Sequence, residues 1–376
     1  MPLPTKLIGR PPVQQNMLLR HLRTQIVRGE LPPGSRMPTR DELERRFGVS
    51  RTTTQRVFDA LVRERFVESR GALGTFVSQT PPHLYDYGLV FWTPFGKKGW
   101  RRFDTAILNE ASAIDDARDC KMRFYYGIDD HSDFDDRHYQ LIADAHANRL
   151  AGIIFTTNPR AALVEELMRQ SPQTPLVAIV GTPDIANVVA VTPSYESFKA
   201  KAMDYLVDQG RRRVAFLNSM AGTPAWQEKR HADLSALAAA KGMKSEPQWM
   251  LTLSATAAMG ARNVIHLLFG QDKANRPDCL FITDDNLVEH ATAGLMAAGV
   301  RVPEDVDVVA HCNFPWPAPS AMPIKRLGYD AREVLRQCVS IIDMQRRGQI
   351  PPKQVFVEAV FEEELAAAVS EQHMDS

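Results

Sequence analysis

The sequence predicts an α/β protein made of two unlike parts. In the first 80 residues, apolar residues recur at helical spacing, and two glycines then lead into a β-prone run over 75–77. From residue 85, short apolar runs are separated by helical stretches of about 10–15 residues, a pattern typical of parallel sheets with helices on both faces. We therefore expect an N-terminal domain over 1–78, a Pro-Pro linker over 79–84 and a larger domain over 85–376.

The N-terminal domain is expected to begin with an amphipathic helix that ends near Gly29. Two short helices then flank a turn at 47–49, and a β-hairpin follows. Ser50 is placed to cap the second short helix by accepting a bond from a free backbone amide. The apolar faces of the three helices are formed by Leu18, Leu22, Ile26 and Val27, by Leu43 and Phe47, and by Val57, Phe58, Leu61 and Val62.

The exposed first turns of the second short helix predict a DNA-binding surface. Their side chains bond phosphates and base edges, and a recognition helix enters the major groove by its N-terminal end. They are Arg51, Thr52, Thr53, Gln55 and Arg56. The glycine-rich run 71–77 predicts a tight wing that approaches a DNA backbone closely. The alternative is a structural helix hairpin with a surface arginine cluster.

Charge is unevenly distributed along the 376 residues. The whole chain has 45 Lys and Arg and 45 Asp and Glu, whereas residues 1–80 hold 14 against 7, which is a net charge of +7. A basic N-terminal domain on an acidic body fits nucleic-acid binding by the first domain only. No apolar run approaches the roughly 20 residues of a membrane span, and the four cysteines lack paired spacing. We expect a cytoplasmic protein with reduced thiols and no membrane partner.

The larger domain repeats a strand–helix pattern twice. We predict strands at 88–92, 122–126, 151–155, 176–180, 214–217, 278–283 and 306–310. Helices are predicted at 103–117, 138–148, 161–169, 194–209, 229–240 and 286–298. Two such halves imply two lobes, and ligands bind beyond the carboxyl ends of the strands in sheets of this kind.

Residues 14–78 resemble the winged-helix head of GntR-family regulators. The resemblance rests on Met37-Pro38-Thr39, on 48–53 and on 74–77. It implies that the second short helix reads the major groove, that Arg40 and Arg56 hold phosphates, and that 71–75 form the wing. The implied DNA-binding residues are Thr39, Arg40, Ser50, Arg51, Thr52, Thr53, Gln55, Arg56, Gly71, Gly74 and Thr75.

Residues 85–365 resemble the LacI/GalR-type effector domain, which is similar to periplasmic sugar-binding proteins. The motifs lie at 151–154, 206–216, 228–230 and 281–309. The fold class so implied is a winged helix-turn-helix followed by a bilobed periplasmic-binding-protein-like domain with two doubly wound parallel sheets. The combination resembles GntR/LacI hybrid repressors, of which arabinose-responsive repressors are the familiar type.

The same resemblance implies an effector site between the lobes. Arg230 matches the arginine that grips ligand hydroxyls or carboxylates, and Asp284 matches a ligand-facing position. Thr156, Ser194 and Cys312 stand at other ligand positions, the last two where the family has aspartate. Five aromatic residues fall on strand-end loops that could line the cleft, with Trp226 favoured for stacking; the alternative is that they pack structure. They are Trp92, Phe95, Trp226, Phe314 and Trp316.

We therefore expect a homodimeric, ligand-responsive regulator that binds operator DNA, most simply a repressor of a catabolic or transport operon, with a sugar or sugar-like effector. No cofactor, metal or catalytic residue is expected. The run 129–138 lacks metal-ligand spacing and is expected to be a solvated acidic loop, and adjacent Asp284 and Asp285 cannot easily act on one bond. The alternatives are a small-molecule-processing enzyme tethered to DNA and a DNA-binding protein with a vestigial pocket.

Overall fold

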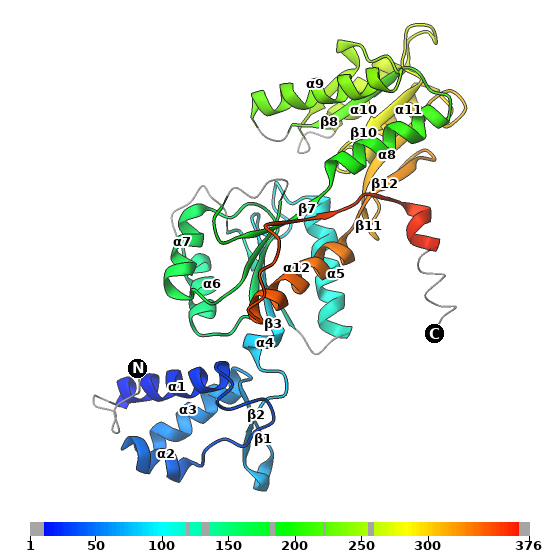
Figure 1. Ribbon diagram of the computed structural model, residues 1–376. Coiled ribbons are helices and arrows are strands. Elements are labelled where there is room, and N and C mark those ends of the chain that lie inside the picture. The colour runs from blue at the N-terminus through cyan, green and yellow to red at the C-terminus, as the bar shows by residue number, and fades with distance from the viewer. Residues whose placement is uncertain are drawn as a thin grey trace.

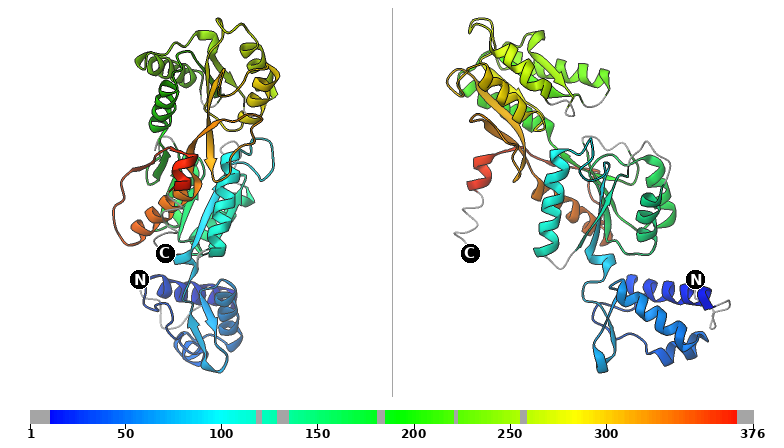
Figure 2. Two further views of the ribbon diagram at one scale, coloured as in Figure 1. Left: turned by 90° about the vertical axis from the view of Figure 1, so that its right-hand side faces the viewer. Right: turned by 180° about the vertical axis from the view of Figure 1, so that it is seen from behind.

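The protein consists of a small head and two larger lobes that follow one another along one axis (Figure 1). This computed structural model describes residues 11–117, 121–128, 135–180, 185–220, 223–254 and 259–367. Views turned by 90° and 180° show the head at one end, next to the first lobe, and the second lobe at the other end (Figure 2). The predicted fold class is confirmed, with a winged head and two mainly parallel sheets.

The head contains the expected three helices and the hairpin. Helices α1 (Pro11–Val27), α2 (Arg40–Phe47) and α3 (Arg51–Arg63) precede strands β1 (Val67–Ser69) and β2 (Thr75–Val77). Thr39 and Glu42 form a reciprocal capping box at the start of α2, which ends at Gly48 with a left-handed φ of 66°. Val62 was expected in the core, but it is 42% exposed. It lies next to Leu61, and a 100° turn per residue carries it off the buried face of α3.

The predicted linker forms part of a packed junction. Helix α4 (Pro82–Tyr85) is a single turn, and its His83 ring stacks on Phe66 of the head with centroids 6.0 Å apart. The carboxylate of Asp86 is fully buried and lies 3.0 Å from the guanidinium of Arg65 in the head and 2.8 Å from that of Arg123 in the first lobe. These contacts hold the head against the first lobe.

The first lobe has a six-stranded parallel sheet with helices on both faces. Its strands are β3 (Asp86–Phe91), β4 (Lys121–Tyr126), β5 (Gly152–Phe155), β6 (Leu176–Ile179), β7 (Val189–Pro193) and β13 (Gln354–Val357), in the order β13-β7-β6-β5-β3-β4. Helices α5 (Arg102–Ala117) and α12 (Ala331–Arg346) pack on one face. Helices α6 (Asp136–His146) and α7 (Ala161–Gln170) pack on the other.

The second lobe repeats this plan with one antiparallel edge strand. Its strands are β8 (Val214–Ser219), β9 (Met250–Leu253), β10 (Cys279–Ile282), β11 (Asp307–Phe314), β12 (Lys325–Asp330) and β14 (Val360–Phe361), in the order β14-β12-β11-β10-β8-β9, and β14 runs antiparallel to β12. Helices α8 (Tyr195–Asp208) and α9 (Pro224–Ala240) cover one face. Helices α10 (Met259–Phe269) and α11 (Val288–Ala297) cover the other.

The lobes are not two consecutive halves of the chain. The chain crosses between them at 193–195, returns at 330–331 and crosses again at 357–360. The return was not predicted: α12 buries Val334, Leu335 and Cys338 against the first sheet, and β13 pairs with β7. Across the described residues, no helix combines the length and apolar character needed to cross a bilayer.

The partly buried His83 predicts an acid-sensitive junction. Burial lowers its pKa to about 4, and the nearby Arg346 acts in the same direction. Between about pH 6.5 and 4 the unfolded chain binds a proton at this residue and the folded protein does not, so falling pH favours unfolding. We expect wild type to lose about 2 kcal/mol of stability from this group between pH 6.5 and 5.

Urea denaturation of full-length wild type and His83→Gln at the two pH values measures the effect. The variant should lose less stability on acidification than wild type, whereas His266→Gln, at an exposed site on α10, should behave as wild type. If the free energy of unfolding had the same pH dependence in all three proteins, His83 would not be the group responsible for the acid sensitivity.

Candidate DNA interface and interlobe cleft

The N-terminal end of α3 is an exposed polar surface. Arg51, Thr52, Gln55 and Arg56 are exposed, whereas Thr53 is only 5% exposed. Ser50 caps the helix, accepting from the backbone N–H of Thr53 at 3.2 Å, and its hydroxyl lies 3.0 Å from that of Thr53. The expectation that Thr53 faces outward is therefore wrong, because its side chain turns back onto the cap.

Contacts within the head orient several of the predicted DNA-binding residues. The Gln55 amide donates to Asp59 at 2.7 Å, along the exposed face of α3. The Arg40 guanidinium lies over the Phe58 ring, 4.9 Å from its centroid. Thr39 accepts from the Glu42 amide at the start of α2, so its hydroxyl acts first as a helix cap.

The wing brings two arginines beside the predicted glycines. Gly71 and Gly74 have φ values of 59° and 106°, conformations that favour glycine. A Cβ at Gly74 would lie 3.4 Å from the Arg36 guanidinium, and the Arg70 guanidinium lies 4.7 Å from the Phe76 ring centroid. Both arginines are exposed and were not predicted as site residues. The only sequence signal for them was the arginine excess of the head.

A cavity of about 440 Å³ lies between the two lobes, beyond the carboxyl ends of the strands. The first lobe contributes Arg101, Phe103 and residues 156–158, 179–180 and 193. The second lobe contributes Tyr195, residues 283–286, His311, Asn313 and Tyr329. Of the predicted effector residues, Thr156 and Asp284 line this cleft directly.

Arg230 lies directly behind the cleft wall and is 9% exposed. Its Nε donates to the Tyr195 hydroxyl at 3.0 Å, and its Nη2 donates to Thr283 Oγ1 at 2.6 Å. The guanidinium is also 5.1 Å from the Tyr195 ring and 5.3 Å from the Trp226 ring. Among the described residues no carboxylate pairs with it, so its charge is balanced only by neutral hydroxyls and aromatic faces.

Polar groups from both lobes face the cleft. Asp284 accepts from the backbone and side-chain amides of Asn286 at 2.9 and 2.7 Å, and Asp285 accepts from Asn313 at 2.8 Å. Two buried atoms, His311 Nδ1 and Thr156 Oγ1, form no hydrogen bond within the described part of the protein. Because buried polar atoms are nearly always paired, these two are suited to a bound ligand.

Cys312 does not line the cleft. It is fully buried on β11, and its neighbours His311 and Asn313 face the cavity instead. Side chains along a strand point alternately to the two faces of the sheet. An alignment with the family that is shifted by one residue therefore assigns the ligand position to a side chain on the wrong face. Burial raises the pKa of the Cys312 thiol well above its usual range. His311 and Asn313 are therefore site residues that the sequence interpretation missed.

The other predicted effector residues also lie outside the lining. Ser194 is buried and caps α8, and its backbone oxygen accepts from the Tyr329 hydroxyl at 3.0 Å. Phe95 is 62% exposed and packs edge-on against Trp100. Trp92 lines a separate small recess, and Trp226 is half exposed above Arg230.

Nothing among the described residues forms a metal site: no group of three or more His, Cys, Asp or Glu is placed to hold an ion. The acidic run proposed as a solvated loop lies largely outside the described residues, since 129–134 are not among them. Cys120 also lies outside them. Cys279, Cys312 and Cys338 are buried free thiols.

A winged helix-turn-helix joined to a two-lobed domain with an interlobe cleft defines the class of DNA-binding head on a periplasmic-binding-protein-like body. Residues 14–77 match the family described as bacterial regulatory proteins of the gntR family. Residues 203–361 match the periplasmic binding protein-like domain. The chain therefore carries a gntR-type head and a periplasmic-binding-protein-like body, as the sequence motifs implied.

Curated relatives match parts of the chain. The HTH-type transcriptional repressor PurR of Aliivibrio fischeri is 23% identical over 225 residues, which are 56% of this chain and 64% of that protein. The mannosyl-D-glycerate transport/metabolism system repressor MngR of Escherichia coli is 35% identical over 91 residues, 24% of this chain and 36% of that protein. The chain thus spans less than two thirds of these relatives.

Solved structures share the fold of the body. A LacI family regulator from an Arthrobacter species, in complex with lactose, has a TM-score of 0.57 at 15% identity and covers 74% of this chain and 97% of its own. A LacI family regulator from Lactobacillus casei with bound glucose has a TM-score of 0.55 at 17% identity, and the match covers 74% of this chain and 98% of that protein.

The exposed end of α3 predicts the effect of Arg51→Ala. If Arg51 reads a base, the variant should lose about 1–3 kcal/mol of binding to a duplex selected by wild type from a random pool. Fluorescence anisotropy measures this loss, with Arg262→Ala on α10 as the matched control for removal of an exposed arginine. Equal affinity in wild type and Arg51→Ala would remove this residue from the interface.

Proposed function

We propose that the protein is a ligand-responsive transcription repressor that binds operator DNA through its head and a small effector in the interlobe cleft. The observation that carries the proposal is the polar cleft, in which two buried atoms form no hydrogen bond with any described residue. This cleft lies in a body to which a basic winged head is attached by buried contacts. The repressor names of the curated relatives support this function. A homodimer would present two heads to a two-fold symmetric operator.

The effector would act by changing how the lobes close. Three polar contacts between described residues already bridge them: the backbone N–H of Arg102 donates to Asn286 at 3.2 Å, the Arg102 guanidinium lies 3.5 Å from Glu289, and the Trp316 indole N–H donates to Glu110 at 2.8 Å. A ligand can shift this closure only by its difference in affinity for the two arrangements. Because the head is held by the first lobe alone, closure of a dimer's lobes would change the separation of its two heads.

The cleft favours an effector with several hydroxyl groups and one negatively charged or strongly polar group. Asp284, Asn158 and Asn286 offer hydrogen bonds to hydroxyls, and Arg230 offers a charge behind Tyr195 and Thr283. A thermal-shift screen of sugars, sugar acids and nucleosides on the full-length protein tests the proposal. A ligand at 100 times its Kd should add about 2.7 kcal/mol of stability.

A ligand that stabilises the protein in the screen should also cause the protein to release the selected duplex, and the ligand should be recovered unchanged. Turnover of that ligand would favour the alternative of an enzyme tethered to DNA. A protein that binds DNA but that no compound in the screen stabilises would favour a vestigial pocket.

Operator binding should depend strongly on salt. Each phosphate neutralised contributes about −0.9 to the slope of log K against log salt, so a dimer that contacts about six phosphates should show a slope near −5. Arg56→Ala should make the slope less steep by about 2 in such a dimer, one contact per head, because it removes a phosphate contact without altering the fold. A flat titration between 50 and 200 mM salt would contradict DNA binding through this surface.

Arg230→Ala should impair effector binding. Loss of a charge-assisted hydrogen bond costs about 1.5–3 kcal/mol, which is roughly ten- to a hundredfold in Kd. Calorimetry on the full-length protein with the ligand found in the screen measures this loss. Binding to the duplex without ligand should stay near normal, because the head is remote from Arg230. Equal ligand affinity in wild type and the variant would place the effector elsewhere.

A further inference from the structure

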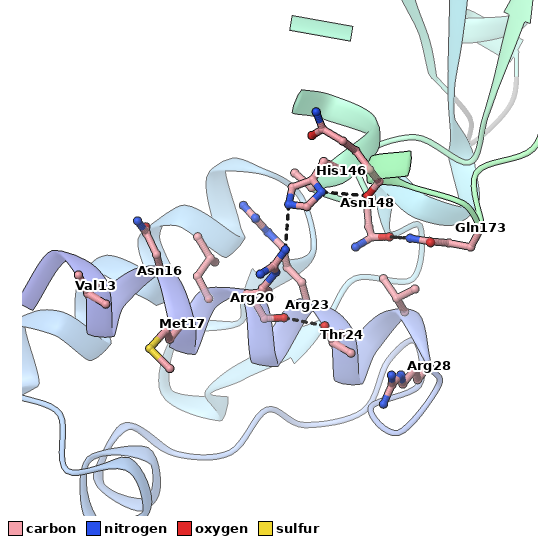
Figure 3. A pocket seen from close by; sticks show the side chains of 14 residues that line it. Val13, Asn16, Met17, Arg20, Arg23, Thr24, Arg28, His146, Asn148 and Gln173 are labelled. Carbon is pink, nitrogen blue, oxygen red and sulfur yellow. Dashed lines mark hydrogen bonds between the residues drawn. The ribbon is translucent and has the colours of Figure 1, made fainter. Parts of the chain in front are cut away.

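A second and larger cavity lies where the head meets the first lobe. Its volume is about 960 Å³, and it runs along α1 on one side and past the carboxyl-terminal ends of α6 and α7 on the other (Figure 3). It is separate from the interlobe cleft and shares no lining residue with it. A ligand in this cavity would contact the head and the lobe at once.

The lining of this cavity is basic. It includes two arginines of α1, the arginine that directly follows this helix and one histidine at the end of α6, namely Arg20, Arg23, Arg28 and His146. Amide side chains add further donors from both walls, among them Asn16 and Gln173. None of the described residues that line it is an aspartate or a glutamate.

The four basic residues differ in whether a carboxylate lies close enough to neutralise their charge. Arg23 pairs with Glu64, which also accepts from Arg149 at 2.8 Å behind the cavity. Arg20 and Arg28 are exposed and have no ion pair with any described residue. Two of the guanidinium groups at this junction are therefore left without a counter-charge.

Among the described residues, the guanidinium of Arg20 has one hydrogen-bond partner, a ring nitrogen of His146. His146 Nδ1 lies 3.0 Å from the backbone oxygen of Gln170, so the proton of the neutral imidazole belongs on Nδ1. Nε2 can then accept from the Arg20 guanidinium, which lies 3.0 Å away (Figure 3). This bond orients Arg20 across the junction but does not neutralise it.

We propose that this cavity binds an extended small-molecule polyanion whose phosphate or carboxylate groups are held by Arg20 and Arg28. Arg20 lies on α1 and Arg28 directly follows the end of this helix, eight residues later, which corresponds to about 12 Å along the helix axis. An anion with several charged groups can lie along the helix between them. The guanidinium fork suits either kind of oxyanion.

Binding here would couple a second ligand to DNA recognition. The anion would contact α1 of the head and the amide side chains of Asn148 and Gln173 in the lobe, so it would favour the docked position of the head. A ligand that prefers one arrangement of head and lobe must change DNA affinity if DNA also prefers one arrangement. This coupling needs no occupant in the interlobe cleft.

The test is calorimetry of inorganic tripolyphosphate with the full-length protein at constant ionic strength. Wild type should bind, and Arg20→Ala and Arg28→Ala should each bind about tenfold more weakly, as expected for loss of one charge-assisted contact. Arg262→Ala controls for the removal of an exposed arginine, and Arg51→Ala controls for binding at the DNA surface. Both controls should keep wild-type affinity. Citrate in place of tripolyphosphate distinguishes carboxylate from phosphate recognition.

Three results would overturn the proposal. They are no binding of either anion by wild type at millimolar concentration, equal affinity in wild type, Arg20→Ala and Arg28→Ala, and loss of binding in Arg51→Ala alone. The last result would assign the anion to the DNA surface. Circular dichroism melting of each variant separates a lost contact from a lost fold, and none of these measurements requires the effector of the interlobe cleft.

Discussion

The buried carboxylate of Asp86 is the interaction on which the arrangement of head and body depends. It begins β3, is fully buried, and is shared by Arg65 of the head and Arg123 of the neighbouring strand. Burial raises its pKa even with both arginines beside it. Asp86 therefore links the head and the first lobe through one shared carboxylate. The head is thus attached to the first lobe by more than a covalent tether.

Because the head is attached to the first lobe, the three crossings between the lobes determine how the second lobe is connected to the rest of the protein. Because 193–195, 330–331 and 357–360 are the only described connections from one lobe to the other, the lobe closure proposed above would bend the chain at these segments. The cleft lies beside them, lined by Pro193 and Tyr195 at the first crossing and by Tyr329 at the second. A ligand there contacts both lobes near the segments that would bend. The head follows the first lobe in any such movement.

The two cavities differ in their distance from the head. The interlobe cleft is remote and can act only through the relative position of the lobes, whereas the junction cavity is formed by the head itself. Their chemistry also differs. The cleft combines carboxylates, amides and one arginine behind hydroxyl groups, and the junction presents arginines and a histidine without a lining carboxylate. One protein could therefore respond to two unlike small molecules through one DNA-binding surface.

Local rules in the sequence determined much of this protein. The cap at Ser50, the glycine turn at Gly48 and the strand–helix alternation from residue 85 are short-range features, and the structure contains each of them. Motif resemblance also identified Arg230, Asp284 and Thr156 near one cavity. These features depend on neighbours in the chain or on patterns that a single segment carries.

Only the tertiary structure decided the rest, because it depends on which distant segments meet. The return of α12 and β13 to the first lobe arises from packing partners more than 140 residues earlier in the chain, as the pairing of Gln354 with Ala190 shows. The choice of His311 and Asn313 over Cys312 follows from the register of β11, which a shift of one residue inverts. The junction cavity exists only where α1 meets His146, and no pattern within either segment indicates the other.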